Sequence, residues 1–198
     1  MEPSWARAAR WVDLDLDSTQ KSQLRKYRDW LIEEAIPAGV IGPGETKRID
    51  RRHIGDSLLF AGYFDTTVEQ VWDLGTGAGL PGIPLAVALP HISFRLVDRS
   101  GRRIALVRRA IRILGLKNCQ VVLERIEDLK GKTPVIVSRA SLPPDLLGKV
   151  AKHHLTRDGV AIVAGSWLTR PEQPGWVTKE IPSDVLDQPI WILIMRCE

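Results

Sequence analysis

Apolar residues recur every three or four positions between Ser18 and Gly39, which predicts an amphipathic helix with its start and end signals at those two positions. A second helix is expected over about residues 45–61 on the same grounds. Residues 1–17 show no clear period, so a frayed arm and a short docking helix are both compatible with them. We therefore expect a small N-terminal helical cap over residues 1–69.

From residue 70 onward, short apolar runs alternate with helix-length segments. This alternation is typical of parallel βαβ units. The last two apolar runs, at 175–181 and 189–196, have no helix-length segment between them and are expected to pair antiparallel at one edge of the sheet. Residues 70–198 are thus predicted to form one α/β domain. Its earlier strands are expected at residues 71–74, 92–98, 119–124, 134–139 and 159–165, and its helices at residues 83–89, 100–115 and 145–154.

A cluster of glycines follows the first predicted strand, in the run Asp73-Leu-Gly-Thr-Gly-Ala-Gly-Leu-Pro-Gly82. Glycines at a strand-to-helix turn permit a tight bend and let backbone N–H groups approach a ligand. Asp98 ends the next predicted strand, 23 residues after Gly75, where a carboxylate can accept both hydroxyls of a ribose. Two cofactor classes match these features, a dinucleotide and S-adenosylmethionine (SAM).

The charge of Asp73 favours SAM over a dinucleotide. A pyrophosphate on the loop would lie near this carboxylate in a partly desolvated cleft, which is costly, whereas the ammonium and sulfonium groups of SAM would be attracted to it. A reversed last strand is also the usual topology of SAM methyltransferases. We therefore expect a Rossmann-like class I SAM methyltransferase fold, with a mostly parallel seven-stranded sheet, an antiparallel last strand and an N-terminal helical cap. The loop residues expected at the cofactor are Asp73, Gly75, Thr76, Gly77 and Gly79.

Composition narrows the class of protein further. Of 198 residues, 28 are Lys or Arg and 24 are Asp or Glu, and the net charge of +4 is compatible with a nucleic-acid partner without establishing one. Cys119 and Cys197 form no CxxC pair or Cys/His cluster, so neither a disulfide scaffold nor a metal site is expected. No apolar run is long enough to span a bilayer, and we expect a cytoplasmic protein without membrane contact.

Basic residues are concentrated in the first half of the second predicted helix and on one face of the helix at 100–115. We expect them to contact RNA phosphates, although solvated helix faces have the same composition. His53 lies among these arginines, and its imidazole is expected to be neutral and exposed, where it can contact substrate or cofactor. The residues expected at RNA are Lys47, Arg48, Arg51, Arg52 and Arg102.

Five longer segments carry a more specific signal than a glycine motif alone. They are RHIGDS (52–57), DLGTGAGLPGIPLA (73–86), LVDRSGRR (96–103), ERIEDL (124–129) and VSRA (137–140). In their order and separations they resemble the RsmG/GidB family over about residues 20–165. Members of that family are SAM-dependent methyltransferases of small-subunit ribosomal RNA. The resemblance implies methylation of a guanine N7 in 16S rRNA, as naked RNA or in the assembling small subunit, and we expect the chain to be a monomer.

Carried over by matching motif, the resemblance also implies the roles of single residues. Their positions, and not the resemblance, make two residues the expected catalytic-site residues: Arg139, which follows the fourth predicted strand at the cleft rim, and His53, on the predicted cap over the cleft. Guanine N7 is a lone-pair nucleophile without a proton, so its methylation needs positioning rather than a general base. The residues implied to contact SAM are Gly75, Leu80, Ile126, Glu127 and Arg139, with Asp98 on the ribose.

Two segments depart from the family pattern. Ile41-Gly-Pro-Gly-Glu45 replaces the usual Asn-Leu-Thr tract, and Val163-Ala164-Gly165 replaces the usual Leu-Lys-Gly at the end of the fifth strand. The missing lysine at Ala164 motivates an alternative hypothesis, an RNA-binding or ribosome-assembly protein that kept the fold and lost turnover. A third hypothesis is an NAD(P)-dependent oxidoreductase in which Arg99 or Arg102 holds a 2′-phosphate.

Overall fold

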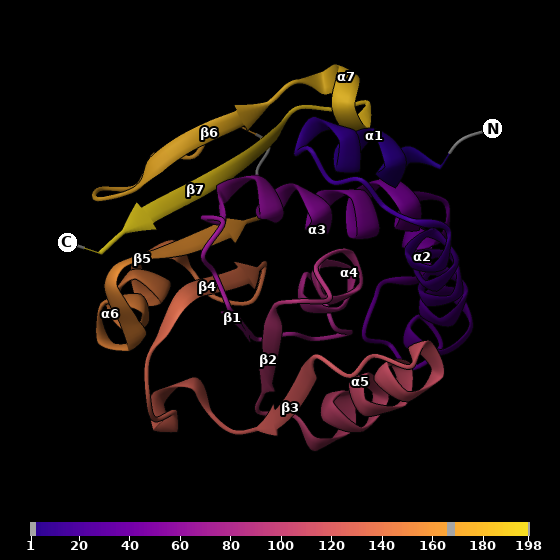
Figure 1. The fold of residues 1–198 in the computed structure, drawn as a ribbon, viewed down its shortest axis with the longest axis horizontal. Helices are drawn as coiled ribbons and strands as arrows, with labels where there is room; N and C mark the ends of the chain where they lie inside the picture. Colours follow the sequence, from indigo (N-terminus) through magenta and orange to yellow (C-terminus); the bar gives the residue numbers. More distant parts are fainter. Residues whose placement is uncertain (1–2, 166–168, 198) are drawn as a thin grey trace.

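A seven-stranded sheet is the central element of the computed structural model, which describes residues 3–165 and 169–197 (Figure 1). The strand order is β3-β2-β1-β4-β5-β7-β6. The pairs from β3 to β5 are parallel, whereas β7 runs antiparallel to both β5 and β6. The predicted mostly parallel sheet with a reversed end is therefore confirmed. The strands are β1 (Gln70–Leu74), β2 (Ser93–Asp98), β3 (Cys119–Leu123), β4 (Thr133–Arg139), β5 (Leu155–Ala164), β6 (Val177–Ile181) and β7 (Ile190–Arg196).

Helices cover both faces of the sheet, with α6 on one side and α2, α4 and α5 on the other (Figure 1). Successive residues of a strand point to opposite faces. In β5, Ile162 and Ala164 enter the larger core under the N-terminal helices, while Ala161 and Val163 enter the smaller core under α6. The α-helices are α1 (Ser4–Trp11), α2 (Ser18–Trp30), α3 (Asp56–Leu58), α4 (Gly82–Ala88), α5 (Gly101–Leu114), α6 (Pro144–His154) and α7 (Ser183–Leu186).

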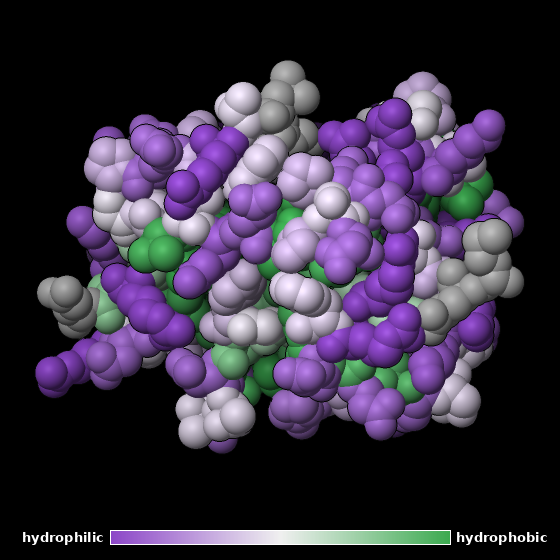
Figure 2. All heavy atoms as spheres, turned by 90° about the horizontal axis from the view of Figure 1, so that it is seen from above, coloured by the Kyte–Doolittle hydropathy of each residue, from purple (hydrophilic) through white to green (hydrophobic). Residues whose placement is uncertain are grey.

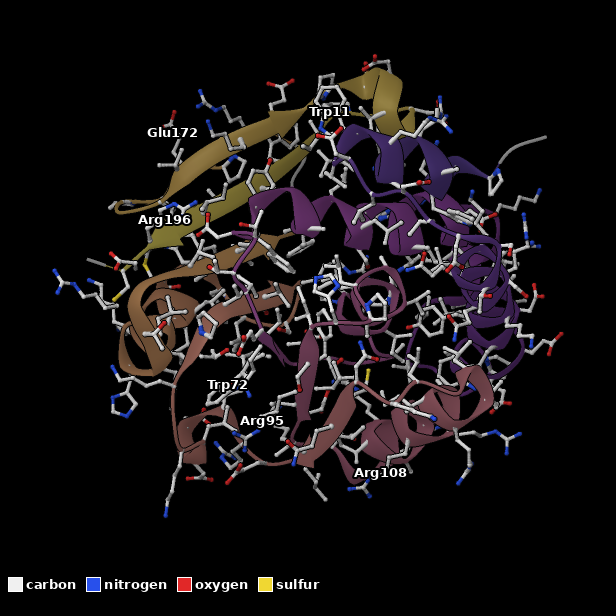
Figure 3. The ribbon with its side chains drawn as sticks, viewed as in Figure 1. Trp11, Trp72, Arg95, Arg108, Glu172 and Arg196 are labelled. Atoms are coloured by element: carbon white, nitrogen blue, oxygen red, sulfur yellow. The ribbon has the colours of Figure 1, made fainter. Side chains whose placement is uncertain are left out.

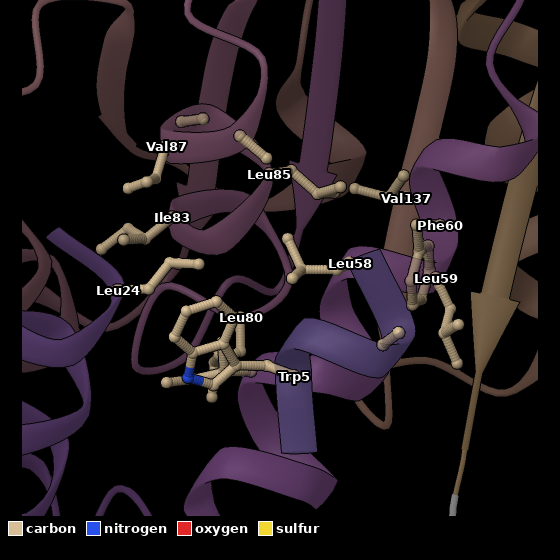
Figure 4. Close-up of a cluster of buried hydrophobic side chains, with 14 of the residues drawn as sticks. Trp5, Leu24, Leu58, Leu59, Phe60, Leu80, Ile83, Leu85, Val87 and Val137 are labelled. Atoms are coloured by element: carbon tan, nitrogen blue, oxygen red, sulfur yellow. The ribbon is translucent and has the colours of Figure 1, made fainter. Parts of the chain in front are cut away.

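The N-terminal residues form a docking helix rather than a frayed arm. Helix α1 buries Trp5 against the cap and against α7 at the other end of the chain. Helix α2 begins at Ser18 as expected, because Asp17 and Gln20 close a reciprocal capping box around its first turn. Leu58 of the cap lies in one buried cluster with Val137 of the sheet (Figure 4). Cap and sheet therefore share a continuous hydrophobic core.

The helix expected over residues 45–61 is not a single regular α-helix. It is a series of short helical turns in which a π turn carries one extra residue, so that His53–Gly55 are all buried. A methyl group on Gly55 would lie 2.8 Å from the side chain of Leu186 and 3.3 Å from the Cα of Trp5. The segment thus meets α1 and α7 too closely for a simple amphipathic helix. Its turns are η2 (Pro43–Arg48), η3 (Ile49–Gly55), α3 and η4 (Leu59–Tyr63).

Hydrophilic side chains cover most of the face seen in Figure 2, and apolar residues show mainly in the hollows between them. Trp11, at the end of α1, is an exception, because 48% of its surface is exposed (Figure 3). Among the described residues, no helix combines the length and the apolar character that a bilayer crossing requires.

The two tryptophans of α1 provide a matched test of the docking contact. Trp5→Ala should lower the free energy of unfolding by about 3–5 kcal/mol, since it empties a fully buried site. Trp11→Ala should change it by less than about 1 kcal/mol. Urea unfolding of the full chain, followed by circular dichroism, measures both values. Equal effects of the two substitutions would show that α1 does not depend on the burial of Trp5.

Candidate functional site

A buried carboxylate fixes the glycine-rich loop between β1 and α4 by hydrogen bonds. Asp73, the last residue but one of β1, has no exposed surface, and its Oδ2 accepts hydrogen bonds from the Thr76 hydroxyl at 2.6 Å and the Gly82 N–H at 2.9 Å. Burial raises the pKa of Asp73 to about 7, partly opposed by these two hydrogen bonds. Asp73 therefore does not face the ligand space, contrary to expectation, because its side chain turns under the loop and ties it down.

Gly79 also faces the protein interior instead of the ligand space. Its φ of +98° is in the left-handed region that favours glycine, and a Cβ there would lie 2.4 Å from the side chain of Ile83. The neighbouring Ala78 carbonyl accepts a hydrogen bond from the hydroxyl of Tyr27 on α2 at 2.8 Å. The loop is thus fixed by β1, by α4 and by the N-terminal cap.

A cavity of about 630 Å³ lies over this loop, at the carboxyl ends of β1, β2 and β4. Ligands of open parallel sheets bind at this edge. Besides the predicted residues, the walls include apolar side chains and one unexpected acid, Glu45. The predicted residues that the fold brings together there are His53, Gly75, Thr76, Gly77, Leu80, Asp98, Ile126, Glu127 and Arg139.

Asp98 marks the side of the cavity next to β2 and β3. One carboxylate oxygen accepts the Gly77 N–H at 3.1 Å, the other accepts the Ser100 N–H at 2.9 Å, and the Arg103 guanidinium lies 3.6 Å away. The side chain is held in place at the end of its strand while it lines the cavity. An acceptor fixed in this way can bind paired hydroxyls of a ligand.

Arg139 marks the opposite side, at the end of β4, and joins the sheet to the cap. Its Nη1 donates to the Arg52 carbonyl at 2.8 Å and lies 3.6 Å from the Asp56 carboxylate. Its Nη2 lies 3.0 Å from Nδ1 of His53. Because a guanidinium only donates, this Nδ1 accepts, so the proton of a neutral imidazole is on Nε2, which donates to Glu45 at 3.1 Å.

The charges in this chain of contacts follow from its burial. His53 is buried rather than exposed as expected, since the π turn carries it inward. Burial, and next the Arg139 cation, lower the pKa of His53 to about 4, so the imidazole is neutral at pH 7. Burial alone would raise the pKa of Glu45, but the hydrogen bond from His53 and the Arg52 cation outweigh it and lower that pKa. Glu45 is therefore a carboxylate at neutral pH.

The basic residues expected at RNA lie outside the cavity lining. Arg48 and Arg52 come within 3.5 and 3.6 Å of Glu45, and Arg51 comes within 3.9 Å of Asp187. Arg102 donates to the Ala38 carbonyl at 2.8 Å, and Lys47 is exposed on η2. Four of these side chains belong to the cap, and Arg102 belongs to α5. In the described parts of the chain, no three His, Cys, Asp or Glu side chains are grouped to hold a metal ion.

Glu45 is the functional candidate that sequence reasoning missed. It belongs to the tract Ile41-Gly-Pro-Gly-Glu45, which stands out as a departure from the family pattern, and that departure was the available signal. Only the short helical turns of the cap bring Glu45 to the carboxyl end of β4, more than 90 residues away in sequence. Asp56, which follows the π turn and faces Arg139, was missed for the same reason.

Comparison with known proteins matches residues 20–168 to the family model GidB, described as rRNA small subunit methyltransferase G. Ribosomal RNA small subunit methyltransferase G of Chlorobium luteolum is 36% identical over 182 residues, which cover 88% of this chain and 76% of that protein. The protein of the same name from Acidothermus cellulolyticus is 36% identical over 69% of this chain. The match covers 61% of the Acidothermus protein, so the chain spans less than two thirds of its length.

Solved structures agree with the fold. TehB from Haemophilus influenzae superposes with a TM-score of 0.54 at 15% identity, over 79% of this chain and 66% of that one. A fibrillarin/Nop5p complex gives a TM-score of 0.52 at 15% identity, over 73% of this chain and 81% of that one. At these identities the likeness concerns the fold alone, and it supports the Rossmann-like architecture.

The protonation of His53 can be tested directly by NMR titration of its imidazole. The midpoint should lie near pH 4, well below the ordinary value of 6.5. Stability that depends on the neutral ring should be complete above pH 6.5 and be lost as the pH falls through about 4. Arg139→Met should raise the midpoint, because it removes the adjacent cation.

Arg108→Met is the control for this titration, since Arg108 is exposed on α5 and points away from the cap (Figure 3). It should leave the His53 midpoint unchanged. A wild-type midpoint near 6.5 would contradict the buried, arginine-paired imidazole.

Proposed function

Since the chain belongs to the GidB family of small-subunit rRNA methyltransferases, we propose that it transfers a methyl group from SAM to the N7 of a guanine in 16S rRNA. The observation that carries this proposal is the cavity at the carboxyl edge of the sheet, with Asp98 on one side and Arg139 on the other. All five segments that resemble the family contribute residues to the cavity wall, together with residues outside them such as Glu45 and Leu142. The proposal covers the activity, the substrate and the partner of the whole protein.

The residues around the cavity suit SAM at both of its ends. Asp98 supplies paired acceptors for ribose hydroxyls, and Ile126 with Glu127 supplies an apolar surface and an acceptor for the adenine next to it. Arg139, on the β4 side, supplies a cation for the carboxylate of the methionine part. The backbone of Gly75–Gly77 forms the floor between them. Asp73 contributes by fixing this floor, not by contact.

Bound SAM supplies an electrophilic methyl group on a positively charged sulfur. The protein's own task is to hold the guanine in line with that methyl group and to exclude water. Guanine N7 carries a lone pair and no proton, so no side chain has to act as a general base. The neutral, buried His53 agrees with this division, because its ring is fully engaged in orienting Arg139 and Glu45.

The alternative functions are less well supported. Asp73 is buried and does not face the ligand, so its charge does not disfavour a dinucleotide. The family membership disfavours an oxidoreductase instead. The lysine missing at Ala164 motivated the hypothesis of an RNA-binding or ribosome-assembly protein without turnover. Ala164 is buried in β5 between β4 and β7 and does not line the cavity. The alanine itself therefore contributes no side chain to the cavity wall.

For the RNA, we propose that phosphates follow the basic residues around the cavity mouth. Arg48 and Arg52 lie beside Glu45, and Arg102 lies at the start of α5 on the other side. Phosphate contacts of this kind fix the register of the RNA without reading its bases. Lys47 and Arg51 extend the same track along the cap. We further propose that a cytoplasmic monomer acts on naked rRNA or on the assembling small subunit.

The purified protein should transfer labelled methyl groups from SAM to 16S rRNA in small subunits taken from cells that lack the gene. Mass mapping of the RNA should find the label as 7-methylguanosine at one position. If methyl groups were transferred neither to the small subunits nor to naked 16S rRNA, the proposal would be contradicted.

Asp98→Asn tests the cofactor site within the same function. Loss of the carboxylate should weaken SAM binding at least about tenfold in isothermal titration, since hydrogen bonds to a charged group contribute about 1.5–3 kcal/mol. Asp128→Asn, at an exposed position outside the cavity, is the matched control and should bind SAM as the wild type does. Equal affinity of both variants would remove Asp98 from the site.

A further inference from the structure

Glu45 is a carboxylate that lines the cavity, and none of the contacts proposed for SAM involves it. The ribose is assigned to Asp98 and the methionine carboxylate to Arg139, so neither of these two groups of the cofactor takes Glu45 as its partner. This inference rests on the proposed function, since it asks how the same cavity recognises the base to be methylated.

The surroundings of Glu45 fix both its position and its charge. Oε2 accepts the Nε2–H of His53, and Oε1 lies 3.5 Å from Arg48 and 3.6 Å from Arg52. The side chain keeps 20% of its surface exposed, toward the cavity that it lines. A carboxylate offers about four acceptor positions, so these contacts leave some of them available to a ligand. The cavity therefore presents a rigid, negatively charged acceptor pair.

A purine with two adjacent donors complements such an acceptor pair. The Watson–Crick edge of guanine presents N1–H and the N2 amino group side by side, whereas adenine presents the bare N1 lone pair at that edge, which a carboxylate repels. N7 lies on the opposite side of the ring system from this edge. We propose that Glu45 selects guanine by accepting hydrogen bonds from N1–H and N2–H, which leaves N7 free to face the methyl group.

The rest of the cavity wall suits the two faces of a purine. Ile41 comes from the segment just before η2, and Leu142 and Leu146 come from the segment after β4, so apolar surface reaches the Glu45 side from two elements. Leu146 is 38% exposed, so it offers apolar surface on which a base can stack. His53 joins Glu45 to Arg139, so the acceptor for the base and the cation for the cofactor are held by one ring.

The test compares guanosine with inosine, which keeps N1–H and lacks the N2 amino group. The nucleotide mapped as the methylated position is introduced as either base into 16S rRNA by ligation of RNA fragments. Wild-type kcat/KM should favour guanosine by about tenfold or more, as expected for a hydrogen bond to a charged acceptor. Glu45→Gln, which replaces one acceptor oxygen by a donor, should reduce this ratio to within about threefold of unity. Comparing the ratio between proteins cancels any intrinsic difference between the two bases.

Two controls separate this inference from the function it rests on. Glu69→Gln, at an exposed position before β1 at the opposite edge of the sheet, should keep the wild-type ratio. SAM affinity of Glu45→Gln, measured by isothermal titration, should stay within about threefold of wild type. Failure of the wild type to methylate guanosine would overturn the proposed function itself.

If the wild type methylates guanosine, the role of Glu45 can be decided separately from the proposed function. A guanosine preference that is unchanged in Glu45→Gln would overturn the assignment. So would a tenfold or greater loss of SAM affinity in Glu45→Gln, which would place Glu45 at the ammonium group of the cofactor.

Discussion

The site depends on one buried carboxylate. Asp73 has no contact with solvent, yet it accepts the Thr76 hydroxyl and the Gly82 N–H and so ties both ends of the glycine-rich loop to β1. Gly82 has to be a glycine for this contact, because a Cβ there would lie 2.2 Å from Leu96 and 2.6 Å from the Asp73 carboxylate. This loop forms the floor of the cavity. The contacts proposed for SAM require that this floor is rigid.

The walls of the cavity come from parts of the chain that are far apart in sequence. Asp98 is fixed by the loop and by the start of α5, whereas Arg139 is fixed by the cap through Arg52, His53 and Asp56. The cap is therefore part of the site and not only a cover over it. Its shared core with the sheet, and the hydrogen bond from Tyr27 to the loop, keep both walls in register.

Much of this architecture could be predicted from the sequence, because local signals coincide there. The strand alternation, the glycine cluster and the acid at the end of the next strand each have a short-range physical cause, and the structure brings Gly75, Asp98 and Arg139 to one cavity. The orientation of Asp73 could not be predicted in the same way. The sequence places a carboxylate next to the loop, but whether it points up to a ligand or down to Gly82 is decided by packing of α4 against β2.

His53, which was misplaced, and Glu45, which was missed, both belong to the cap. His53 was expected at the surface because it lies among arginines in the sequence, and the π turn instead buries it beside Arg139. Glu45 reaches the cavity through a short 3-10 turn that leaves no periodic pattern. Irregular helical turns that meet a sheet across long sequence distances leave little local signal, and they are where the structure adds most to the sequence.

A crystal structure of the protein with S-adenosylhomocysteine shows directly where the cofactor lies. Both ribose hydroxyls should bond to Asp98 and the amino-acid carboxylate to Arg139, with Glu45 free of the ligand. A ligand bound away from Asp98, or a structure in which S-adenosylhomocysteine leaves the cavity empty, would contradict this placement of the cofactor.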